Sequence, residues 1–223
     1  MANIGFTRDE IILTLDVLFF SGDEPLTKNS QSIQSLCYTL QNLPIHPLEK
    51  RPPNFRNPVG VSDQIRTFRG QITGTSRSSW GVGKTFHTVY QEYSDRLDEL
   101  HAIASAIRKN QQFFQGCYFG QQEENDGFPE GALLAHLHRI MEVRDSAQLP
   151  IADRCAICKL SVERIYHDSS VAIEHHLLEP LTELDANTRY CEEDFIDVCP
   201  NCHAALHHYR PWLAREEVNR ILR

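Results

Sequence analysis

The chain has 223 residues, of which 41% are hydrophobic and 23% charged, as in an ordinary globular protein with room for one large or two modest domains. A formal net charge of −8 argues against a protein that coats nucleic acid non-specifically, but it does not exclude a local basic face. The N-terminus lacks a basic, apolar signal segment, and IILTLDVLFF is interrupted by Asp16 and too short to span a bilayer. We therefore expect a cytoplasmic protein without a membrane partner.

The first two thirds of the chain are predicted to be mainly helical. Apolar residues at helical spacing predict helices over residues 11–19, 32–43, 61–68, 86–109 and 132–144. Either Thr7 or Asp9 could cap the first of these helices.

A proline-rich loop and the short helix after it carry a local excess of basic residues. Four prolines among residues 46–60 predict an ordered loop without regular structure. Between His46 and Lys84 seven cations stand against two acidic residues. We predict that this region contacts a phosphate backbone. The candidate DNA-binding residues are Arg51, Arg56, Arg66 and Arg69. A solvated surface with helix caps would explain the same residues equally well.

Two Cys-x-x-Cys pairs, Cys155 with Cys158 and Cys199 with Cys202, indicate a metal site. Each pair places two sulfurs on one tight turn, and two such turns complete the tetrahedron of thiolates that zinc favours. Without a secretion signal, disulfide bonds are the weaker interpretation. Because the surrounding short strands and helix offer a small core, we expect structural zinc to supply much of the folding free energy there.

The same region contains more potential ligands than one metal ion needs. The additional groups are His175, His176, Asp194, His203 and His207. VAIEHHLLEPL predicts a strand, on which the adjacent His175 and His176 project to opposite sides. His203 and His207 are four residues apart and share one face of a short predicted helix, a spacing that suits two imidazoles on one cation. We therefore predict a second cluster, available for chemistry.

The order Cys-x-x-Cys, EHH followed by Pro-Leu, and DFIDVCPNCH-x-x-x-H resembles the HNH (ββα-metal) endonucleases, particularly the zinc-braced restriction enzymes of the McrA type. The motif runs from Cys155 to His207, and segments such as TRDEIILTLD and PNFRNPVGV resemble the family more weakly. The resemblance implies an α+β protein with a mainly helical DNA-recognition domain at 1–146. A ββα-metal nuclease domain with a four-cysteine structural zinc site would follow at 147–223.

The resemblance also implies roles for the individual side chains. His176 would be the general base that deprotonates water, and Asp194, at the central position of the motif, would orient the base loop. His175 would join His203 and His207 around a catalytic Mg²⁺, Mn²⁺ or Ni²⁺ ion. Three residues separate the histidine pair from Pro180 where two are expected. If the turn slips by one residue, His175 and His176 exchange roles.

These implications predict a metal-dependent DNA endonuclease, a restriction enzyme against foreign DNA that could depend on base modification. Cleavage of both strands of double-stranded DNA by one site per chain suggests a homodimer, or successive nicking. A nuclease of RNA or of single strands would use the same site. The alternative from another class is a non-catalytic zinc-ribbon module that binds nucleic acid. Such a module needs the four cysteines but has no use for the histidine cluster.

Overall fold

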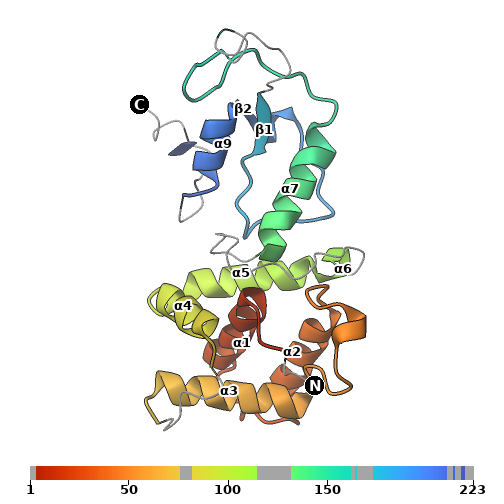
Figure 1. The fold of residues 1–223 in the computed structure, drawn as a ribbon, viewed down its shortest axis with the longest axis vertical. Coiled ribbons are helices and arrows are strands. Elements are labelled where there is room, and N and C mark those ends of the chain that lie inside the picture. The colour runs from red at the N-terminus through yellow and green to blue at the C-terminus, as the bar shows by residue number, and fades with distance from the viewer. Residues whose placement is uncertain are drawn as a thin grey trace. The chain divides into compact units, whose positions relative to one another are not determined.

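The computed structural model describes residues 4–75, 82–114, 132–161, 164, 173–209, 213, 217 and 218. It divides into two compact units, residues 1–133 and 134–223 (Figure 1). The protein is rich in helix with one small two-stranded sheet, an α+β arrangement. None of the described helices combines the length and the apolar character that a membrane crossing requires.

The described part of the first unit is helical. Its elements are α1 (Arg8–Phe20), α2 (Gln31–Asn42), the 3-10 turn η1 (Leu48–Lys50), α3 (Pro58–Ile72), α4 (Lys84–Tyr93), α5 (Leu97–Lys109) and α6 (Gln111–Phe114). Helix α1 is central, because it contacts α2, α3, α4 and α5 and is buried continuously from Asp9 to Asp16. Thr7, and not Asp9, caps this helix, and its backbone N–H donates to Glu10 Oε2 at 2.8 Å.

The single helix expected over residues 86–109 is two helices, α4 and α5. The chain turns between them at Ser94–Arg96, where the Arg96 guanidinium donates to the Glu92 carbonyl at 2.8 and 3.1 Å. Both helices bury apolar side chains, and α1 contacts both. The apolar spacing from Tyr93 to Leu100 is seven residues, which a continuous helix would also show. Periodicity alone therefore could not reveal the turn.

A buried ion pair joins α1 to the loop before α3. Glu10, with 0% exposure, accepts from Arg56 Nε at 2.6 Å and Nη2 at 2.9 Å, and His46 Nε2 lies 3.1 Å away. The same guanidinium donates to the carbonyls of Ile4 and Gly5 and stacks 3.8 Å above the Phe6 ring. The side chain of Arg56 is thus buried in the helical unit and bonded there to protein acceptors.

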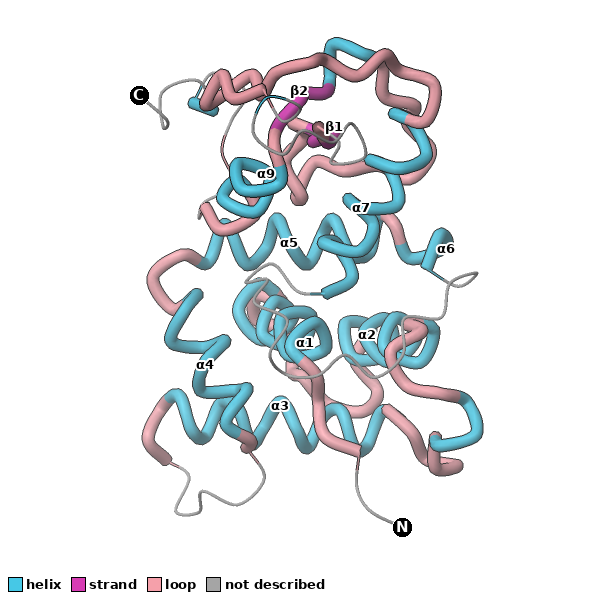
Figure 2. The backbone as a smooth tube through the Cα atoms, turned by 45° about the horizontal axis from the view of Figure 1, so that its top comes forward, coloured by secondary structure: helices cyan, strands magenta, loops and turns pink. Residues whose placement is uncertain are grey.

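The second unit places a small sheet between two helices. Its described elements are α7 (Ala132–Ser146), whose first two residues belong to the first unit, β1 (Glu174–Leu177), the 3-10 turn η2 (Glu192–Asp194), β2 (Phe195–Val198) and α9 (Pro200–Leu206). Strands β1 and β2 are antiparallel, with His175 opposite Asp197 and His176 opposite Ile196. The described strands, magenta in Figure 2, lie in this unit alone. We expected the boundary at residue 146, but most of α7 belongs to the second unit because it packs on β1.

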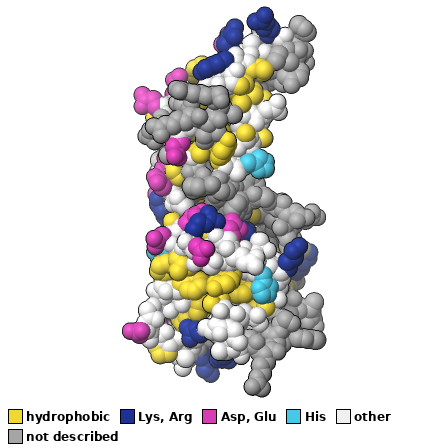
Figure 3. Space-filling model, turned by 90° about the vertical axis from the view of Figure 1, so that its left-hand side faces the viewer, with side chains coloured by type: hydrophobic (Ala, Val, Ile, Leu, Met, Phe, Trp, Pro, Cys, Tyr) yellow, Lys and Arg dark blue, Asp and Glu magenta, His cyan; other side chains and the backbone are white. Residues whose placement is uncertain are grey.

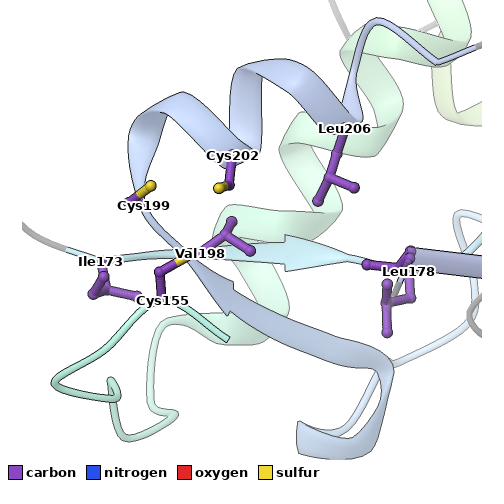
Figure 4. Packing of buried hydrophobic residues seen from close by; sticks show 8 residues of the cluster. Cys155, Ile173, Leu178, Val198, Cys199, Cys202 and Leu206 are labelled. Atoms are coloured by element: carbon purple, nitrogen blue, oxygen red, sulfur yellow. The ribbon is translucent and has the colours of Figure 1, made fainter. Parts of the chain in front are cut away.

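One hydrophobic cluster of the second unit contains much sulfur. Its buried members are Cys155, Ile173, Leu178, Val198, Cys199, Cys202, Leu206 and Val218. Figure 4 shows Val198 of β2 between the cysteines on one side and the leucines on the other. The three cysteines in this cluster are candidates for a metal brace.

Candidate metal centres

The predicted grouping of four cysteines is present. The sulfur atoms of Cys155, Cys158, Cys199 and Cys202 all lie within 4.8 Å of one another and could hold a metal ion such as zinc. Cys158 Sγ and Cys199 Sγ are 3.8 Å apart, too far for a disulfide bond of about 2.05 Å. A tetrahedron with zinc–sulfur bonds of about 2.3 Å has edges of about 3.8 Å. In Figure 4 the sulfurs of Cys199 and Cys202 point toward each other at the start of α9.

Backbone hydrogen bonds shape the first cysteine turn. The Cys155 N–H donates to the Leu160 carbonyl at 2.9 Å, and the Cys155 carbonyl accepts from the Lys159 N–H. Lys159 has a positive φ of 62°. The Ala156 N–H donates to the Asp197 carbonyl at 2.7 Å and so joins the turn to β2. Burial raises the pKa of the Cys155 thiol, but backbone N–H groups outweigh this effect and bring it to about 7. Burial and the neighbouring sulfurs raise the pKa of Cys202. Four thiolates at this spacing would repel one another, and a bound cation would offset that repulsion.

A second group of ligand atoms lies where α7, β1 and α9 meet. Glu142 of α7, His176 of β1 and the pair His203 and His207 of α9 each offer one ligand atom within 4.8 Å of the others. His203 Nε2 and His207 Nε2 are 3.0 Å apart, and Glu142 Oε1 lies 3.2 Å from His176 Nδ1 and 3.4 Å from His203 Nε2. These four residues are hereafter the histidine–glutamate cluster.

An outer carboxylate orients one of these imidazoles. Glu174 Oε2 lies 2.6 Å from His203 Nδ1, so that the Nδ1–H donates to the carboxylate. The proton at Nδ1 leaves Nε2, the atom that faces the cluster, with a free lone pair in neutral imidazole. Metal-binding histidines in proteins are held in this way. Two Nε2 atoms at 3.0 Å must share either a proton or a cation.

Two of the three imidazoles of the cluster favour the neutral form that binds metal, whereas contacts with Glu142 and Glu174 outweigh burial and raise the pKa of His203, whose proton a bound ion would displace. Burial and the surrounding imidazoles lower the pKa of His207 to about 3, and burial also lowers the pKa of His176. Burial would raise the pKa of Glu142, but its contacts with His176 and His203 lower it below the ordinary value. Neutral imidazoles beside an ionised carboxylate are the forms that coordinate a divalent ion.

The two adjacent histidines point to opposite sides of β1, as the strand pattern predicted. We expected His175 to join His203 and His207, but the structure places His176 there. His175 Nδ1 lies 2.5 Å from Asp197 Oδ1, its cross-strand partner, and Asp197 Oδ2 accepts from the Ala152 N–H at 2.8 Å. The structure thus places His176, and not His175, among the possible metal ligands, the half of the exchanged assignment that concerns the ligand.

Asp194 holds the turn that faces the end of β1. Its side chain accepts from the Cys191 N–H at 2.9 Å, and its carbonyl accepts from the Leu178 N–H at 2.9 Å. The residue therefore orients the backbone that follows the histidine pair, but it is not a member of the histidine–glutamate cluster.

Sequence reasoning missed Glu142, Glu174 and His138. His138 is completely buried, donates from Nε2 to the Leu177 carbonyl at 2.9 Å and places Nδ1 3.4 Å from Glu142 Oε1. Burial lowers the pKa of His138 to about 4. His138 and Glu142 are separated by one helical turn, a spacing visible in the sequence. Their contact with β1, some 35 residues later, is a tertiary feature that this spacing does not reveal.

The four candidate DNA-binding arginines separate into two pairs. Arg56 is buried against Glu10, and Arg51 donates to the carbonyls of Leu43 and His46, which stabilises the end of α2. Neither guanidinium is presented to a phosphate backbone, because protein acceptors occupy both. Arg66 and Arg69 are exposed on α3 and remain candidates. On the face drawn in Figure 3, basic and acidic side chains are interspersed.

A comparison with models of known families, with curated proteins and with solved structures finds no match for this chain. Its chemistry must therefore be inferred from the two clusters. Both clusters take ligands from α9 and the residues that cap it. Cys202 and His203 are neighbours on this helix, and they belong to different clusters.

Proposed function

We propose that this protein is a metal-dependent DNA endonuclease in which the second unit is an HNH (ββα-metal) domain braced by zinc. Two antiparallel strands followed by a helix, with histidines on β1 and α9 and four cysteines beside them, support this proposal. The observation that carries it is the His203 imidazole, bound by Glu174 at Nδ1 and aimed at His207 through Nε2. A zinc-ribbon binding module that holds only the four-cysteine metal has no need for such an arrangement.

The histidine–glutamate cluster can hold the cation that phosphodiester hydrolysis requires. A divalent ion such as Mg²⁺, Mn²⁺ or Ni²⁺ at the cluster would polarise the scissile phosphate and lower the pKa of a bound water. His176, His203 and His207 would hold the ion, and Glu174 would fix the ring of His203. Asp194 would keep the end of β1 in place. His175 lies on the opposite side of the strand, so we assign it to the support of β2 through Asp197.

The first unit would then bind the DNA substrate, with Arg66 and Arg69 of α3 as contacts to the phosphates. A restriction enzyme against foreign DNA, dependent or not on modified bases, is the role we propose. Cleavage of both strands would require a homodimer or successive nicking.

A second candidate function is a non-catalytic module with two structural metal ions. Glu142 and His176 are only 7% and 2% exposed, and four protein ligands can close a tetrahedral shell completely. Structural zinc sites are closed in this way, whereas catalytic sites keep a position open for water. This observation favours a metal that stabilises the fold without reacting.

DNA cleavage decides between the two. The zinc-loaded full chain would be incubated with Mg²⁺, Mn²⁺ or Ni²⁺ and supercoiled plasmids, either unmodified or carrying 5-methylcytosine, 5-hydroxymethylcytosine, N6-methyladenine or phosphorothioate. We expect nicked or linear product from at least one combination and none from His203→Ala. His208→Ala, an exposed histidine beside His207, is the matched control and should cut normally. Intact plasmid in every combination, or equal cutting by His203→Ala, would refute the enzyme.

A further inference from the structure

We infer that Glu142 of α7 is a direct metal ligand, so that the second centre binds a transition-metal ion through three imidazoles and one carboxylate in preference to Mg²⁺. This deepens the proposed function by specifying the ion of the same site, which would take a fifth position for water if it acts in catalysis. The use of that ion in catalysis rests on the proposed function, whereas the argument for the ligand rests on geometry.

The distances place Glu142 at a corner of a coordination tetrahedron. Bonds of about 2.0–2.1 Å from a metal to nitrogen or oxygen give ligand-to-ligand edges of about 3.3–3.4 Å. Glu142 Oε1 lies 3.2 Å from His176 Nδ1 and 3.4 Å from His203 Nε2, close to this spacing. The remaining histidine pair, at 3.0 Å, needs only a small separation to accept an ion between its nitrogens. The ligand oxygen also accepts from the Leu177 N–H at 3.1 Å, which fixes its position against β1.

A bound cation would also neutralise the buried charge of Glu142. Glu142 is 7% exposed, and its ion-pair partners among the described residues are the imidazoles of His138, His176 and His203. Glu10 in the first unit, which is equally deep, has a permanently charged guanidinium against both oxygens. A buried carboxylate without such a partner is costly unless it coordinates a metal or faces a protonated histidine. A bound divalent ion satisfies the carboxylate and the imidazoles at once.

The donor set determines which ion fits. Imidazole nitrogen suits zinc, nickel, copper and iron, whereas Mg²⁺ prefers oxygen ligands in an octahedron and retains several waters. Three imidazoles and one carboxylate therefore select a late transition-metal ion. The family resemblance by itself did not distinguish among Mg²⁺, Mn²⁺ and Ni²⁺ as the catalytic ion.

The test is a Co²⁺ titration of the full chain with zinc in its cysteine site. Calorimetry and visible absorption spectroscopy monitor the binding. We expect one Co²⁺ to bind, Ni²⁺ or Zn²⁺ to displace it, and millimolar Mg²⁺ to leave it in place. Glu142→Gln keeps the size of the side chain but removes its charge, and should weaken binding at least about tenfold. Glu183→Gln removes the same charge from an exposed position of the same unit and should bind normally.

Two results would overturn the inference: equal Co²⁺ affinity in Glu142→Gln and the unaltered chain, or no binding beyond the cysteine site. Should Glu142→Gln fail to fold, as judged by zinc content and circular dichroism, hydrogen exchange in the unaltered chain supplies the answer. Co²⁺ should then slow exchange in α7 around Glu142, and unchanged exchange there would contradict a ligand on this helix.

These measurements are independent of catalysis. A protein that binds Co²⁺ through Glu142 but cuts no DNA would retain this inference and lose the nuclease. A protein that cuts DNA with Mg²⁺ and binds Co²⁺ equally well without the Glu142 carboxylate would retain the nuclease and lose this inference.

Discussion

The two units of this protein deal with buried charge in different ways. In the first unit Glu10 is buried against Arg56 and His46, so the protein itself supplies both members of the ion pair. In the second unit Glu142 is surrounded by imidazoles, and four thiols gather without a cation of their own. The protein thus neutralises Glu10 with its own side chains, whereas the second unit has ligands arranged for ions.

The hydrophobic packing of the two units also differs. The first unit packs helices around α1, which is buried on nearly all sides. The main cluster of the second unit has eight buried residues, and Cys155, Cys199 and Cys202 are three of them. A metal bound to these cysteines would add directly to the stability of the cluster. Four predictions test this contrast, from the largest expected effect to the smallest.

Removal of the cysteine-bound metal should unfold the second unit and leave the first folded. Cys199→Ser should lose the bound zinc and several kcal/mol of stability, because the metal supplies folding free energy directly. Elemental analysis and hydrogen exchange resolved by segment are the measurements. Cys191→Ser, an exposed thiol of the same unit, should keep its zinc. Hydrogen exchange in the second unit that is the same with and without a chelator would contradict a structural metal.

Breaking the ion pair of the first unit should destabilise that unit without any effect on metal content. Arg56→Met leaves the buried charge of Glu10 with His46 but without its guanidinium, at a cost of about 3–5 kcal/mol. Arg66→Ala changes an arginine whose side chain is 74% exposed and should shift stability by less than about 0.5 kcal/mol. Urea unfolding measures both variants. Equal stabilities would mean that Arg56 is not a structural residue.

Asp9 should make the stability of the first unit fall as pH rises. Burial raises its pKa from 3.8 to about 6, although the Ala132 N–H donates to it at 3.2 Å. Because the folded state binds this proton more tightly than the unfolded state, stability is lost between about pH 4 and pH 6. Asp9→Asn cannot ionise, so its stability relative to the unaltered chain should improve over that interval by on the order of 1–3 kcal/mol. A pH-independent difference between the two proteins would contradict the raised pKa.

The exposed arginines of α3 should affect DNA affinity and leave folding unchanged. Arg66→Ala combined with Arg69→Ala should weaken binding and reduce the slope of log affinity against log salt by about 2, one for each lost phosphate contact. Lys28→Ala, an exposed cation on the loop between α1 and α2, is the control. An unchanged slope would mean that neither arginine contacts a phosphate and that both belong to a solvated surface.

The sequence predicted those features that depend on neighbours along the chain. The spacing of apolar residues located the helices, and the two Cys-x-x-Cys pairs identified four sulfurs that lie together. Alternation along a strand predicted that His175 and His176 point apart. Each of these inferences uses only the geometry of a single element, which is why it could be made without a structure.

Other features depend on distant segments and were beyond such rules. The break between α4 and α5 preserves the apolar spacing, and Arg56 resembles a surface cation until Glu10 is placed against it. Glu142 gives no signal in the sequence, because its helix must first be packed on β1.

The histidine pair shows where the two kinds of information divide. The sequence by itself determined that one of the two residues faces the ligands of α9, since successive side chains on a strand alternate. Only the tertiary structure decided that it is His176, with Glu142 beside it. The register of β1 against β2 and the packing of α7 and α9 set which face of the strand is covered, and a shift of one residue would reverse the assignment.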